Sequence, residues 1–136
     1  MKLLIDVNIL LDVLQARKPH LKESSLIWKL CETHQTDGFV PALSFANLVY
    51  IMRKEMDPEQ VEKTLDSISL IFEIADLQSS DLKKAAGLHW SDFEDAVQSV
   101  TASRIGADYI ITRNTKDFSQ SAVPAVSPKQ FLELLS

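Results

Sequence analysis

The stretch Leu3-Leu4-Ile5-Asp6-Val7-Asn8 determines how the rest of the sequence is interpreted. Three successive apolar residues are too few for a helix and are typical of a strand that is buried on both faces of a parallel sheet. Asp6 breaks this run, and between Asn8 and Leu14 the apolar residues recur at a helical spacing, until Pro19 ends the pattern. We therefore expect a buried strand that ends at Asp6 and leads directly into a helix.

The chain has 136 residues, which is the length of one domain with one hydrophobic core. Its composition, 46% hydrophobic and 24% charged with 3 Gly and 5 Pro, is that of an ordinary globular protein. Cys31 is the only cysteine, so the chain can form neither an internal disulfide nor a Cys-rich zinc site. No apolar stretch approaches the ~20 residues that cross a bilayer. We expect a single-domain cytoplasmic protein with no membrane partner.

Helical patterns and short apolar runs alternate along the rest of the chain. Helices are predicted over residues 20–33, with Leu26, Ile27 and Leu30 facing inward, over 44–55, from Asp57-Pro58 onward, over 79–88 with Ser79 as the cap, before residue 109, and over 128–135. Strands are predicted at 70–74 and 109–111, a strand or turn at 38–41, and an edge strand at 125–126. This order indicates an α/β fold with a parallel sheet covered on both faces.

In such sheets ligands bind beyond the carboxyl ends of the strands. This directs attention to Asp6-Val7-Asn8 and to Thr112-Arg113-Asn114, which follows the run at 109–111. Asp6 has two interpretations: it caps the following helix, or it presents a carboxylate in the crevice. Thr112 and Asn114 are also typical of a simple turn.

A third group of polar residues opens a helix at Ser91-Asp92-Phe93-Glu94-Asp95. Ser91 and Glu94 have the spacing of a capping box, which gives Glu94 a structural explanation. Asp92 and Asp95 share one helical face, where two like charges repel each other. A divalent cation would explain the pair, and oxygen ligands of this kind suit Mg²⁺ or Mn²⁺.

The net charge of −5 and the pI near 5.1 argue against broad binding to nucleic-acid phosphates. They do not exclude a nuclease, because the metal site of a nuclease is itself acidic. Arg113 and Lys116 provide local positive charge that could meet a phosphate backbone. Trp90 is expected to pack against the protein or a partner rather than to stack on bases.

Taken together, three motifs resemble the PIN-domain ribonucleases, especially the VapC-like toxins. They are Leu3-Leu-Ile-Asp6-Val-Asn8, then Asp92-x-x-Asp95-Ala96, then the stretch from Gly106 to Phe118 with Thr112-Arg-Asn114-x-x-Asp117-Phe118. The resemblance implies a three-layer α/β/α sandwich around a parallel sheet of about four to five strands. It also implies a metal-dependent endoribonuclease with RNA as substrate, a small antitoxin protein as partner, and a homodimer.

The resemblance also implies roles for individual residues. Asp6, Asp92 and Asp95 would bind Mg²⁺ (or Mn²⁺) and act in catalysis with Asn114, while Asn8, Asn47, Thr112, Arg113 and Asp117 would position water or substrate. The sequence departs from the family pattern at Asn47, where a Glu is usual, and at Asn114, where an acid is expected. Because amides add no negative charge, these departures should lower the affinity for metal.

Three other functions remain as alternatives. The first is a PIN-like protein that has lost catalysis and acts through protein contacts, which Asn47 and Asn114 favour. The second is a phosphatase with an aspartyl nucleophile, but such enzymes have a second Asp two residues after the first, where this chain has Asn8. The third is a response-regulator receiver, which needs paired acids near the first strand and a late Lys that this sequence does not place convincingly.

Overall fold

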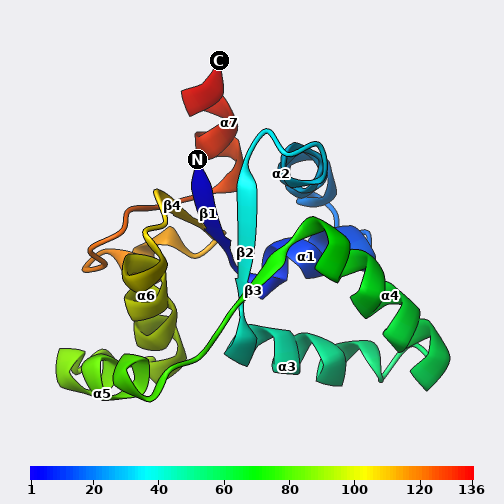
Figure 1. Cartoon of the computed structure of the whole chain (residues 1–136). Helices are drawn as coiled ribbons and strands as arrows, with labels where there is room; N and C mark the ends of the chain where they lie inside the picture. The colour runs from blue at the N-terminus through cyan, green and yellow to red at the C-terminus, as the bar shows by residue number, and fades with distance from the viewer.

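The computed structural model describes residues 1–136 and confirms the predicted α/β fold. Its elements are, in chain order, β1 (Lys2–Ile5), α1 (Val7–Leu14), α2 (Leu21–Glu32), β2 (Asp37–Pro41), α3 (Ala42–Met52), α4 (Pro58–Ile71), β3 (Glu73–Ala75), α5 (Ser79–Leu88), α6 (Phe93–Ile105), β4 (Tyr109–Ile111), the 3₁₀ turn η1 (Thr115–Phe118), β5 (Ala125–Val126) and α7 (Pro128–Leu135) (Figure 1). No helix is both long and apolar enough to span a membrane.

The sheet has five parallel strands in the order β3-β2-β1-β4-β5. The central strand β1 is the run Leu3-Leu4-Ile5, whose three side chains are fully buried, as a strand covered on both faces requires. In the register between β1 and β4, Ile5 pairs with Ile111. The residues that follow this pair, Asp6 and Thr112, therefore leave the sheet side by side at its carboxyl edge.

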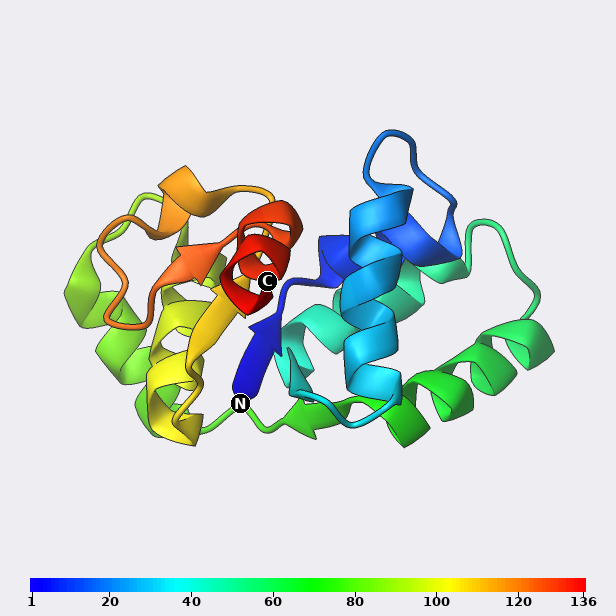
Figure 2. The same ribbon diagram turned by 90° about the horizontal axis from the view of Figure 1, so that it is seen from above.

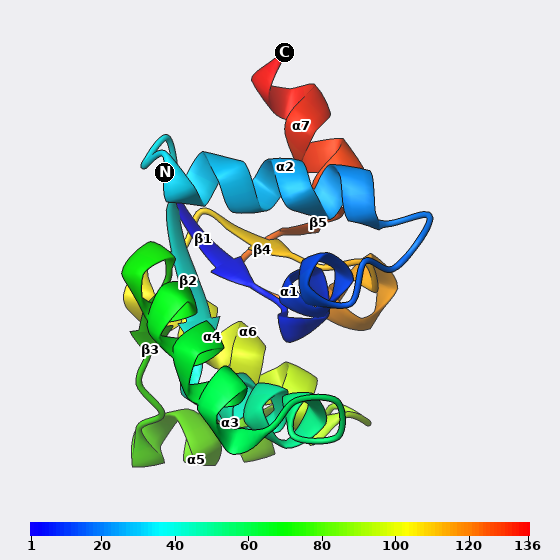
Figure 3. The same cartoon turned by 90° about the vertical axis from the view of Figure 1, so that its right-hand side faces the viewer.

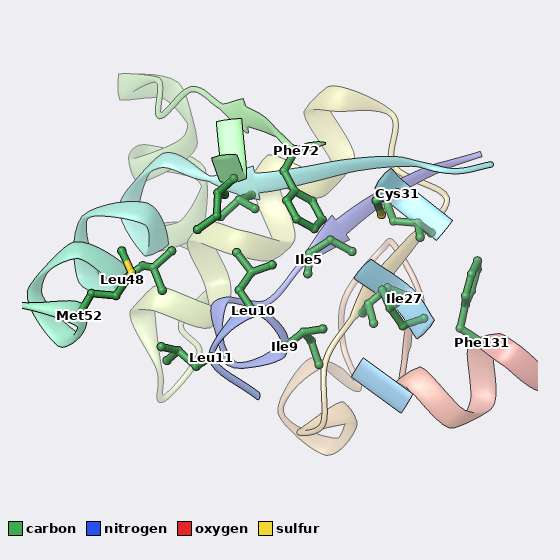
Figure 4. Packing of buried hydrophobic residues seen from close by; sticks show 14 of the residues in the cluster. Ile5, Ile9, Leu10, Leu11, Ile27, Cys31, Leu48, Met52, Phe72 and Phe131 are labelled. Carbon is green, nitrogen blue, oxygen red and sulfur yellow. The ribbon is translucent and has the colours of Figure 1, made fainter. Parts of the chain in front are cut away.

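Helices cover both faces of the sheet (Figures 1 and 2). The larger cluster of buried side chains joins alternate residues of β1 to α1, α2, α3, α4 and α7 on one face. Figure 3 looks onto this side, and Figure 4 shows side chains such as Ile9, Ile27, Leu48 and Phe131 in the cluster. A smaller cluster around Leu4 joins the opposite face to α6 and the loop before β5. The predicted three-layer arrangement is confirmed.

Three local predictions were wrong. The apolar run 70–74 is not one strand: Leu70 and Ile71 finish α4, and β3 begins only at Glu73. Ile68 already faces the core, and a residue two positions further along a helix points the opposite way, so Leu70 is 83% exposed. Leu26 is likewise exposed while its neighbour Ile27 is buried, and the cap of α5 is Gln78 rather than Ser79.

Candidate functional site

Asp6 combines both of the roles considered for it. As the residue that caps α1, it accepts the backbone N–H of Asn8 at Oδ1 (3.2 Å). Its Oδ2 accepts the hydroxyl of Thr112 (2.8 Å), which the pairing of β1 with β4 brings alongside. Asp6 is 7% exposed, and this burial raises the pKa of its carboxyl group, although the hydrogen bonds from Thr112 and Asn8 oppose the rise. Asp6 is thus a rigid carboxylate at the carboxyl edge of the sheet.

Thr112 connects Asp6 to the loop that follows β4. Its Oγ1 donates to Asp6 and accepts the backbone N–H of Asn114 (3.1 Å). Thr112 is fully buried, so both hydrogen bonds are shielded from water. One hydroxyl therefore fixes the start of the loop that carries Asn114 and Asp117.

The start of α6 differs from the predicted capping box. Asp92, not Ser91, caps the helix, with its Oδ1 accepting the backbone N–H of Asp95 (3.0 Å). This shift of one residue releases Glu94 from a capping role. The Glu94 carboxylate instead accepts the side-chain amide of Asn47 on α3 (2.6 Å). Glu94 is a site residue that the sequence analysis missed, because the spacing to Ser91 gave it another explanation.

These segments enclose a cleft of about 360 Å³ at the carboxyl edge of the sheet. Its acidic lining consists of Asp6, Asp92, Glu94, Asp95 and Asp117, and its amide lining includes Asn8, Asn47, Gln98 and Asn114. No Lys, Arg or His side chain lines it. The structure thus brings together every residue predicted for the site, either in the lining or, as with Thr112, in contact with it, except Arg113.

The electrostatics of the cleft are those of crowded, uncompensated carboxylates. The pKa of Asp95 rises from its ordinary value of 3.8 to about 6, first because the side chain is partly buried and then because Asp92 and Asp117 carry like charges nearby. Two further buried atoms of the lining, Ser44 Oγ and Gln98 Oε1, make no hydrogen bond. A cleft with excess negative charge and unused oxygen atoms favours a positively charged occupant.

Arg113 lies outside this cleft. Its Nη2 donates to Asp12 Oδ1 (3.1 Å), and the Asp12 carboxylate, which is fully buried on α1, also accepts the hydroxyl of Ser24 (2.9 Å). Arg113 therefore ties the loop after β4 to α1. A signal for Asp12 is present in the sequence, because it is the only charged residue of α1, in which all other residues except Asn8 are apolar.

The donor set fits Mg²⁺ or Mn²⁺ by its chemistry. Every polar side chain that lines the cleft carries a carboxylate, hydroxyl or amide group, and Mg²⁺ and Mn²⁺ prefer oxygen ligands. No group of three or more His, Cys, Asp or Glu side chains is already arranged as a complete metal site. Such a complete arrangement is not required, because Mg²⁺ is usually held by one or two carboxylates and keeps several waters.

Comparisons with known proteins agree with this fold. The chain is similar to the solved structures of a toxin-antitoxin complex from Klebsiella pneumoniae (TM-score 0.71, 22% identity, covering 92% of this chain and 96% of that one) and of FitAcB from Neisseria gonorrhoeae (TM-score 0.71, 16% identity, covering 93% and 98%). It is also similar to VapBC2 from Rickettsia felis bound to a DNA fragment from the promoter (TM-score 0.68, 18% identity, covering 93% and 98%). No curated protein sequence matches the chain. A family model described as the PIN domain matches residues 2–116, and the chain therefore belongs to the PIN domain family.

Proposed function

We propose that this protein is a metal-dependent endoribonuclease that hydrolyses RNA phosphodiester bonds with Mg²⁺ (or Mn²⁺). The observation that carries the proposal is the convergence of five carboxylates on one cleft whose lining contains no cationic side chain. They come from the residue after β1, from the cap and first turn of α6, and from η1 after β4. A cleft of this charge would repel a polyanion unless metal neutralises it. Its place at the carboxyl edge of a parallel sheet is where such folds bind ligands.

In this proposal Asp6 and Asp95 hold the metal, and Asp92 contributes the oxygen that is not used in capping α6. A bound Mg²⁺ supplies a water of lowered pKa and stabilises the charge that develops on the attacked phosphate. Asn8 and Asn114 orient water or phosphate oxygens through their side-chain amides. Asp117, in the same lining, accepts a hydrogen bond from a water, and Thr112 keeps Asp6 in place.

Glu94 compensates for the amide at Asn47. The family pattern has a Glu on the helix where this chain has Asn47, and here that amide donates to the carboxylate of Glu94. The charge that α3 lacks is therefore supplied from α6, in contact with the position where it is missing. The lining keeps enough negative charge for a divalent cation, in spite of Asn47 and Asn114.

The biological setting we propose is a cytoplasmic toxin–antitoxin pair with this chain as the toxin. Support comes from the solved structures of the same fold, among them the toxin-antitoxin complex from Klebsiella pneumoniae and VapBC2 from Rickettsia felis. By analogy, a small antitoxin protein binds this chain, and the toxin forms a homodimer.

The second candidate is a PIN-domain protein that acts only through protein contacts. Asn47 and Asn114 favour it, because both stand where the family pattern has acids. The two candidates differ in one measurable property: only the nuclease binds a divalent metal at the cleft and cleaves nucleic acid.

Mn²⁺ titration by calorimetry, paired with cleavage of a pooled RNA substrate, tests the proposal. We expect wild type to bind Mn²⁺ and to cleave RNA, and Asp95→Asn to lose both metal binding and cleavage. Asp66→Asn, which alters an exposed acid on α4, serves as the matched control and should behave as wild type. If wild type neither binds metal at millimolar concentration nor cleaves RNA, the second candidate is correct.

A further inference from the structure

A second cavity, of about 570 Å³, adjoins the acidic cleft. It is formed by the residues between α5 and α6, from His89 to Asp92, by Asp95 in the first turn of α6, and by the stretch from Lys116 to Gln120 that includes the end of η1. Three carboxylates, those of Asp92, Asp95 and Asp117, line both the cavity and the cleft. A ligand that reacts in the cleft can therefore extend directly into this second cavity.

The two cavities differ in charge. The cleft contains no cationic side chain, whereas Lys116 lines the second cavity. Lys116 is exposed and takes part in none of the ion pairs of the structure, although acids surround it. Arg113, the other cation of this loop, is already paired with Asp12. Lys116 is therefore the cation of the loop that is free to bind an anion of the ligand.

The second cavity also has a fixed aromatic wall. Trp90 is its one hydrophobic lining residue and is only partly buried. Its ring packs edge-on against the buried Phe118, with the centroids 6.2 Å apart and the planes at 77°. The chain turns at His89, whose φ of +57° ends α5 and starts the short link to α6. Held in this way, Trp90 can offer its exposed part to a ligand without losing further conformational freedom.

An anion next to a flat apolar group is the combination that one nucleotide presents. We propose that the second cavity binds the nucleotide next to the cleaved bond of a single-stranded RNA, with Lys116 on its phosphate and Trp90, contrary to the expectation from the sequence, against its base. A single strand is required because the bases of a duplex are stacked and unavailable. The inference rests on the proposed nuclease function and adds a binding site for the nucleotide beside the cleaved bond.

Steady-state cleavage of a short single-stranded RNA tests this binding site. Lys116→Gln should raise KM about tenfold and leave kcat nearly unchanged, because it removes a charge-assisted contact outside the reacting atoms. Lys129→Gln, which removes another exposed lysine from the lining of a different cavity, is the matched control and should keep the wild-type KM. Thermal unfolding of both variants checks that each is folded.

Modified substrates make the test specific for one phosphate and one base. A neutral methylphosphonate, placed at each linkage in turn beside the cleaved bond, should raise the KM of wild type at one linkage and have no further effect in Lys116→Gln. An abasic site at the same nucleotide should also raise the wild-type KM. The inference would be overturned if Lys116→Gln had the wild-type KM, or if the methylphosphonate raised the KM of Lys116→Gln as much as it raises that of wild type. In either case, cleavage by wild type would still uphold the nuclease function. Absence of any RNA cleavage by wild type would instead overturn the proposed function, and the inference with it.

Discussion

Replacing Asp95 with Asn should make the metal-free protein more stable at about pH 7.5. The carboxyl group has a pKa of about 6 in the folded protein against an ordinary 3.8, so its ionisation opposes folding. This rise corresponds to about 3 kcal/mol at full strength, and because solvent screens a partly exposed group, we expect roughly 1 kcal/mol. The cost is absent well below pH 3.8, where the group is protonated in both states, grows as the pH rises from about 4 to about 6, and is complete above about 6.

Thermal unfolding without metal, at about pH 3 and about pH 7.5, measures this effect. We expect the midpoint of Asp95→Asn to exceed that of wild type by roughly 3 °C at the higher pH and to match it at the lower one. Addition of Mn²⁺ should reverse the order, because metal stabilises only the protein that binds it. Asp66→Asn should follow wild type throughout. If Asp95→Asn is less stable than wild type at about pH 7.5 in the absence of metal, the reasoning from crowded carboxylates is refuted.

Three further substitutions test other parts of the structure. Thr112→Val removes a buried hydroxyl that serves both Asp6 and the backbone of Asn114, and should cost about 2 kcal/mol in denaturant unfolding and weaken Mn²⁺ binding in calorimetry. Asn114→Asp adds a sixth carboxylate to the cleft and should tighten Mn²⁺ binding while lowering metal-free thermal stability at neutral pH. Gly38→Ala would place a Cβ 2.7 Å from Cys31 Sγ and should lower the free energy of unfolding in urea by about 1–3 kcal/mol, with no change in metal affinity.

The sequence was sufficient to predict the parallel sheet and the edge at which the site lies. The buried run ending at Ile5 and the run ending at Ile111 are continuous and apolar, a pattern that leaves few other interpretations. Their terminal residues then follow from the topology, because parallel neighbours end at the same edge. This is why Asp6 and Thr112 could be assigned to one site before their contact was known.

Contacts between distant helices could not be predicted in the same way. Glu94 was assigned to a capping box because Ser91 stands at the right spacing, but spacing does not reveal which residue has the extended backbone of a cap. The partner that gives Glu94 its place, Asn47, is 47 residues away on α3. Arg113 was assigned to phosphate for a similar reason: its actual partner, Asp12, lies on a helix whose packing the local sequence does not specify.

Asp6 and Asp92 each cap a helix and also line the acidic cleft, so a substitution at either residue affects both roles. Each residue caps a helix with one carboxylate oxygen, so truncation to Ala removes a cap as well as a proposed metal ligand, and the lost cap alone costs about 1 kcal/mol. Asn caps as well as Asp does but carries no charge. Comparison of the Asn and Ala variants at one position therefore separates the two roles. Activity lost in the Asn variant comes from the missing charge, whereas stability lost only in the Ala variant comes from the missing cap.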